Sequence, residues 1–129
     1  MERALRTLRA LRTQGRPAFT SDEAVQDRAD RNAQLLAQGC ADIALHIVAA
    51  SGTTAPDTYA DALVRLGAMN VITPDLADRL AAAVRLRNIL VHGYLDVDHG
   101  RLYDELDWIE DTARFAISID AWLAAQGSP

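Results

Sequence analysis

The sequence contains no lysine, so all 13 of its basic residues are arginine. Arginine keeps its charge at physiological pH, and its planar guanidinium grips a phosphate with paired hydrogen bonds. The arginines are unevenly placed: residues 1–16 hold five of them against one glutamate, a net charge of +4, which leaves −9 for the rest of a chain of net charge −5. A protein that coats nucleic acid is basic over its whole surface. Any contact with RNA is therefore expected to be local.

Cysteine and long apolar runs are also scarce. The single cysteine, Cys40, has no second cysteine for a disulfide and no metal-ligand residues at useful spacing, so we expect a small buried hydrophobic residue. No apolar run approaches the length that spans a bilayer, and the N-terminus alternates arginine with leucine and alanine, unlike a signal peptide. These absences predict a cytoplasmic protein with no membrane contact.

Alternation typical of strands is missing too, and helical periodicity dominates instead. A chain of 129 residues, half of them hydrophobic, has the size of one domain, and it shows no repeat, linker or low-complexity tract. The sequence predicts an all-α, up-and-down bundle of about five helices in a single domain over residues 1–129. Residues 1–16 would form a basic first helix, and residues 18–125 the core of the bundle.

Start and stop signals place these helices. Gly15 ends the first, Thr20 and Glu23 form a capping box at the start of the second, and Thr73 caps the fourth. The helices after the first are predicted at about residues 21–50, 58–69, 73–91 and 101–125.

The last predicted helix is apolar on two sides. One side holds Leu102, Leu106, Ile109, Ala113, Ala116 and Ile117, and the other holds Trp108, Phe115, Ile119 and Trp122. Such a helix is either enclosed within its domain or covered by another chain. In so small a domain we favour the second arrangement and predict a homodimer that uses the fourth and last helices.

Chemistry-bearing residues gather at the end of the fourth helix, in the segment RLRNILVHGY. Its predicted buried stripe places Arg87 among apolar residues, where an unpaired guanidinium is costly. Arg87 therefore needs an acidic partner, a phosphate or a cleft open to water. Arg87 and His92 are five residues apart, about 140° around an ideal helix. They converge on one ligand only if the helix distorts before Gly93 or if a second copy adds its own pair across a symmetric cleft.

Two interpretations of this segment stay open. In the first, Arg87 pairs with a buried Asp or Glu, and His92 interacts with the helix C-terminus, where a cation is favoured. In the second, Arg87 holds a phosphate, Asn88 orients it, and His92 acts as acid or base near neutral pH. In that case Arg85 is a candidate RNA-binding residue.

A metal site has little support. His92, Asp96 and Asp98 lie on a predicted turn, but no second histidine stands at a helical ligand spacing. We interpret His46 as a helix-surface residue and His99 as a loop residue. No metal or other cofactor is expected.

The segment RNILVHGY, Arg87 to Tyr94, resembles the signature of the HEPN superfamily, an arginine, four to six residues and a histidine. It is most similar to the HepT-like toxin branch, where a tyrosine follows the histidine by two places. The segments FTSDE, GAMNVITPDLADRL and YLDVD fit the wider pattern, and the resemblance covers roughly residues 18–115.

This resemblance implies a dimeric five-helix bundle with both motifs in one cleft. It implies metal-independent RNA cleavage, in which Arg87 stabilises phosphate charge and His92 activates the ribose 2′-hydroxyl or protonates the leaving oxygen. It also implies a toxin whose partner is a minimal nucleotidyltransferase antitoxin that attaches AMP to Tyr94. Two other classes stay open: a module that positions nucleotide or substrate for a partner nucleotidyltransferase and tolerates loss of His92, and a purely structural dimer that also tolerates changes at Arg87.

Overall fold

The computed structural model describes residues 1–92 and 98–126, with side chains for all of these except residues 87–92. The described residues form seven helices and no strand, which confirms the all-α class. The helices are α1 (Glu2–Thr13), α2 (Arg16–Ser21), α3 (Glu23–Ala50), α4 (Tyr59–Ala68), α5 (Pro74–His92), α6 (His99–Asp104) and α7 (Trp108–Gln126). The long helices α1, α3, α4, α5 and α7 correspond to the five predicted ones, and α2 and α6 are short additions.

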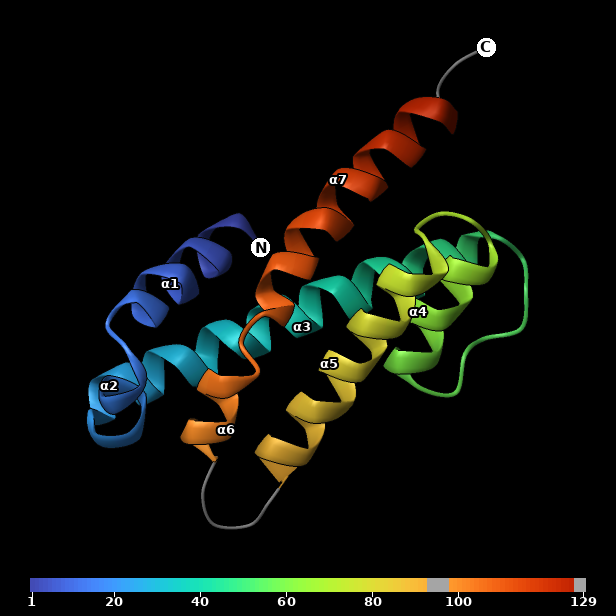
Figure 1. Cartoon of the computed structure of the whole chain (residues 1–129). Coiled ribbons are helices and arrows are strands. Elements are labelled where there is room, and N and C mark those ends of the chain that lie inside the picture. Colours follow the sequence, from blue (N-terminus) through green and yellow to red (C-terminus); the bar gives the residue numbers. More distant parts are fainter. Residues whose placement is uncertain (93–97, 127–129) are drawn as a thin grey trace.

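The long helix α3 forms the centre of the bundle, and α1, α2, α4, α5 and α7 all contact it (Figure 1). Small buried residues such as Ala29, Ala33 and Ala44 on α3 let these neighbours approach closely. Among the described residues, α3 is also the one helix long and apolar enough to cross a membrane by length and composition. Because five helices of the same chain pack around it, we interpret α3 as the core helix of a globular domain.

The start of α3 differs from the prediction. Gly15, at φ 92°, ends the connection after α1, and Pro17 opens the extra helix α2, which includes Thr20. The Thr20 hydroxyl bonds to carbonyls within α2, so the predicted capping box is wrong. Asp22 caps α3 instead, and its carboxylate accepts the backbone N–H of Ala24 and Val25 at 3.0 and 3.3 Å.

The helices α4 and α5 begin within one residue of their predicted starts, and the predicted Thr73 cap of α5 is confirmed, whereas the Thr58 cap of α4 was not predicted. The Thr58 hydroxyl caps α4, and the Thr73 hydroxyl accepts the backbone N–H of Leu76 at 3.2 Å at the start of α5. Asn70, at φ 59°, makes the turn between the two helices. Gly67 packs so tightly there that a Cβ on it would lie 2.7 Å from the Cβ of Ala77. The caps and this close contact fix where α5 begins.

The predicted last helix is interrupted, because residues 105–107 separate α6 from α7. The break lets α6 pack against α2 while α7 packs against α1, α3 and α5. Trp108, Phe115 and Ile119 are buried within the chain's own core, and Trp122 is partly buried against it, so this apolar side of the predicted helix is largely enclosed within the chain. The exposed large apolar residues on α7 are Ile117 and Leu123, and the C-terminal half of α7 extends beyond the other helices (Figure 1).

The arginines of the basic N-terminal region join it to the C-terminal helices. Arg9 of α1 contacts Glu110 with its Nε at 3.0 Å from both carboxylate oxygens. The other two pairs are Arg12 with Asp107 at 2.6 Å and Arg16 with Asp104 at 3.0 Å. These three ion pairs are here called the arginine ladder. The arginine position rises from 9 to 16 while the position of its acidic partner falls from 110 to 104, so the two segments are antiparallel.

Candidate active site at the end of α5

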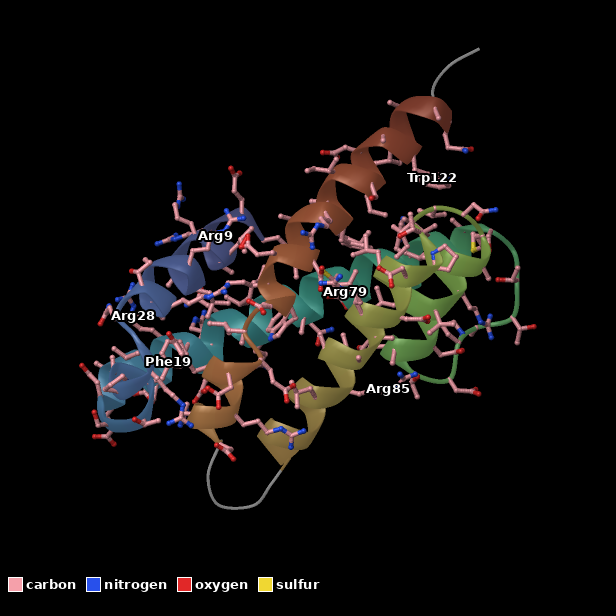
Figure 2. The ribbon with its side chains drawn as sticks, in the orientation of Figure 1. Arg9, Phe19, Arg28, Arg79, Arg85 and Trp122 are labelled. Carbon is pink, nitrogen blue, oxygen red and sulfur yellow. The ribbon has the colours of Figure 1, made fainter. Side chains whose placement is uncertain are left out.

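The motif residues Arg87, Asn88 and His92 occupy the last turns of α5, whose backbone is helical through His92. The backbone is therefore α-helical up to the residue before Gly93, and ideal helical geometry places positions 87 and 92 about 140° apart around the axis. The side chains of residues 87–92 lie outside the described part, as does Tyr94 altogether. Arg85 is exposed on the surface of α5 (Figure 2).

The predicted buried stripe of α5 is confirmed at its described positions. Leu76, Leu80, Ala83 and Val84 are all buried. The same stripe continues toward Arg87 by helical periodicity. The two interpretations of Arg87 therefore stay open.

A buried carboxylate joins α5 to α7. Asp111 of α7 is 3% exposed, and Arg79 of α5 contacts both its oxygens at 3.1 Å. Arg114 of α7 adds a contact of 2.7 Å to Oδ1, and Figure 2 shows Arg79 between the two helices. A buried carboxylate is stable only when cations or hydrogen-bond donors compensate its lost hydration. Arg79 and Arg114 supply that compensation.

The chain that follows the motif is anchored at the start of α6. His99 Nε2 lies 2.9 and 3.0 Å from the two carboxylate oxygens of Asp30 on α3, and the His99 side chain is only 15% exposed. Tyr103 packs against Phe19 of α2 with ring centroids 5.1 Å apart. The interpretation of His99 as a loop residue is therefore wrong. Its acidic partner lies 69 residues away, so no local pattern could have revealed it.

The other histidine and cysteine side chains in the described part of the chain do not form a catalytic or metal-binding group. Cys40 is buried, as predicted, and burial raises the pKa of its thiol to about 12, which keeps it protonated and unreactive. His46 is exposed on α3, as predicted. No group of three or more His, Cys, Asp or Glu among the described residues is arranged to hold a metal ion.

The family model for ribonuclease HepT-like proteins matches residues 1–119. The chain belongs to the ribonuclease HepT-like family. An mRNA nuclease HepT from Shewanella oneidensis is 36% identical over 80 residues, which are 62% of this chain and 60% of that protein. A tRNA nuclease HepT from Aphanizomenon flos-aquae is 35% identical over 74 residues, 57% of this chain and 50% of that protein. These alignments thus span only part of each curated relative.

The HepT-like fold also has a solved counterpart over most of its length. A tri-AMPylated HEPN toxin from Shewanella oneidensis, in complex with an MNT antitoxin, has a TM-score of 0.79 and 29% identity. The match covers 93% of this chain and 90% of that chain. The predicted HEPN-like bundle is therefore confirmed.

Proposed function

We propose that this HepT-like chain is the toxin of a toxin–antitoxin pair and a metal-independent ribonuclease that acts in the cytoplasm. The observation that carries the proposal is the motif itself: Arg87, Asn88 and His92 stand on one uninterrupted helix end in a chain with the fold of a HEPN toxin. The matched relatives are described as mRNA and tRNA nucleases, which supports RNA as the substrate class.

The geometry of α5 favours a site shared by two copies. Because the backbone is helical through His92, one chain separates Arg87 from His92 by about 140°. A homodimer that brings two α5 ends together supplies two arginines and two histidines to one cleft. Arg85, exposed on the same helix, would contact the RNA backbone beside that cleft.

In this cleft the two copies of His92 take opposite roles. One removes the proton from a ribose 2′-hydroxyl, and the 2′-oxygen then forms a bond to the adjacent phosphorus. The bond from phosphorus to the 5′-oxygen breaks, and the second His92 donates a proton to that oxygen. Arg87 stabilises the negative charge that grows on the phosphate, and Asn88 orients it. The products are a 2′,3′-cyclic phosphate and a 5′-hydroxyl.

A minimal nucleotidyltransferase antitoxin would silence the toxin by transferring AMP to Tyr94. The structural relative that carries AMP groups in complex with an MNT antitoxin supports this kind of control. Tyr94 follows His92 by two residues, so AMP attached there adds a phosphate next to the site and competes with RNA for the arginines.

The test is cleavage of a mixed-sequence RNA by the purified chain in the presence of EDTA. We expect cleavage by the wild type and its loss in His92→Ala and Arg87→Ala, with circular dichroism unchanged. The matched control is His46→Ala, which removes an exposed histidine from α3 and should leave cleavage intact. Cleavage that survives His92→Ala, or an Arg87→Ala chain that fails to fold, would favour the binding module or the structural role instead.

A further inference from the structure

A groove of about 700 Å³ separates α1 from α3 on a part of the molecule that the motif does not include. Arg3 and Thr7 line it from α1, and Arg28, Arg31 and Asn32 line it from α3. Residues 28, 31 and 32 share one helical face, as do residues 3 and 7, because they are three or four places apart. Two rows of polar side chains therefore face each other across the groove.

The arginines of this groove are free to bind a ligand. Arg3, Arg28 and Arg31 are exposed, and none forms an ion pair with any residue that the structure describes. In contrast, Arg9, Arg12 and Arg16 are all engaged in the arginine ladder. The groove is lined by three arginines and one acidic residue, Asp27, so it is locally basic although the whole chain has a net charge of −5.

The donors in this groove match a sugar–phosphate backbone. Guanidinium groups bind phosphate oxygens with charge-assisted hydrogen bonds. The Thr7 hydroxyl can bond to phosphate or ribose oxygens, as can the one N–H of the Asn32 amide that does not donate to the Arg28 carbonyl. Leu35, 47% exposed at the same groove, offers apolar surface beside them.

The helix that forms one wall of the groove, α3, also contacts the start of α6, the first described helix after the motif. Asp30 lies on α3 between Arg28 and Arg31, and its carboxylate contacts His99 at the start of α6. His99 follows the motif His92 by seven residues. One helix diameter, about 10 Å, thus separates the arginines of the groove from the anchored end of the segment that follows the motif.

We propose that the α1/α3 groove binds the backbone of single-stranded RNA and holds the substrate outside the cleft where it is cleaved. The proposal rests on the proposed function, because that function makes RNA the polyanion this chain must hold. Most of the affinity of a protein for a nucleic acid comes from such phosphate contacts, and these weaken with added salt.

The test measures binding of a fluorescent, fully 2′-O-methylated RNA of about 20 nucleotides, which has no free 2′-hydroxyl and so cannot be cleaved. The groove variant is Arg28→Gln with Arg31→Gln. The matched control is Arg6→Gln with Arg101→Gln, which removes the same charge from exposed arginines outside the groove. The dissociation constant is measured over a series of salt concentrations for both, together with cleavage of a dinucleotide and of a long RNA.

We expect the groove variant to bind RNA about tenfold more weakly than the control, with the log–log salt slope reduced by about 1.4 for two lost phosphate contacts. Dinucleotide cleavage should be unchanged, and kcat/KM for the long RNA should fall. Equal affinity and slope in the two variants would overturn the proposal. Binding to poly-glutamate is measured in the same way. A groove variant that binds poly-glutamate more weakly but RNA as tightly as the control would also overturn the proposal, because it would indicate an acidic protein surface as the occupant. If the wild type binds RNA through the groove but cleaves none, the proposed ribonuclease activity is wrong and RNA binding in the groove is supported.

Discussion

In the proposed mechanism, control of the toxin depends on Tyr94. It is two places from His92, and no acidic residue lies between Arg87 and Tyr94. An AMP group there adds bulk and a negative phosphate next to groups that bind the RNA phosphate. Modification should therefore block RNA cleavage without disturbing a core formed elsewhere in the chain.

We predict that incubation with the proposed nucleotidyltransferase antitoxin and ATP adds AMP to the wild type and abolishes its cleavage of RNA, and that Tyr94→Phe prevents both effects. Intact-mass measurement and an RNA cleavage assay report the two outcomes. Tyr59→Phe is the matched control, because Tyr59 is an exposed tyrosine, 43% accessible at the start of α4, and its variant should still be modified. A Tyr94→Phe chain that is modified and silenced would remove Tyr94 from the mechanism.

The candidate site shows how far single residues could be predicted from the sequence. The position of Arg87, Asn88 and His92 on a helix end followed from local periodicity and a short motif, and the α5 backbone agrees with it. The partners of His99 and Asp111 did not follow, since Asp30 and Arg79 lie 69 and 32 residues from them. Such pairs depend on how helices pack, which local patterns do not encode.

At the scale of helices, the arginine ladder explains the basic N-terminal region. Arg9, Arg12 and Arg16 pair with acidic residues at the end of α6, at the start of α7 and between these helices. The hydrogen bond from Arg9 lowers the pKa of Glu110 from its ordinary value of 4.5; partial burial opposes this shift, and the charge of Arg9 adds to it. A carboxyl whose pKa is lower in the folded state stabilises that state at neutral pH, and the stabilisation is lost as pH falls through the folded pKa.

Arg9→Gln should therefore lower the stability of the fold slightly at pH 7, and the difference from wild type should shrink as the pH falls below 4.5. Urea denaturation at several pH values measures this difference, and added salt should reduce it at neutral pH because the pair is exposed. Arg6→Gln is the control on the same helix, since Arg6 forms no ion pair with a described residue and should show no such pH dependence. A difference that is independent of pH would contradict the role assigned to Glu110.

At the scale of the whole molecule, the large apolar residues that α7 leaves exposed are Ile117 and Leu123. The aromatic side of the last helix is used inside the chain, as Phe115 is fully buried. Elsewhere on α7, Ile117 is 70% and Leu123 52% exposed. Exposed apolar side chains of this size favour contact with another chain.

We predict that the wild type has about twice the 14.0 kDa mass of one chain at micromolar concentration, and that Ile117→Asp shifts it toward one chain. Burial of an isoleucine side chain contributes about 1.5–3 kcal/mol, and a symmetric dimer loses it twice, so the dissociation constant should rise at least about a hundredfold. Light scattering after gel filtration measures the mass, and RNA cleavage should fall together with the dimer.

The control for that experiment is Val64→Asp, because Val64 is an exposed apolar residue on α4, 37% accessible and away from α7. It should leave the mass at two chains. A wild type that stays at one chain at this concentration would exclude the dimer and, with it, a cleft assembled from two copies.

The sequence alone determined the helical class, the starts of α4 and α5, and the place of the motif at the end of α5. These features depend on interactions between residues at most a few places apart: the apolar period of a helix, a hydroxyl that caps its first turn, and a glycine or asparagine that ends it.

Only the tertiary structure decided where the charges of the first helix go and where the last helix breaks. Arg9 and Glu110 are 101 residues apart, and Arg16 and Asp104 are 88 apart. The apolar pattern of residues 101–125 suits one continuous helix, yet the chain breaks at 105–107 so that α6 can pack on α2 and α7 on α1 and α3. Packing between elements distant in sequence outweighed local helix preference there, because burying several side chains stabilises the fold more than one additional helical turn does.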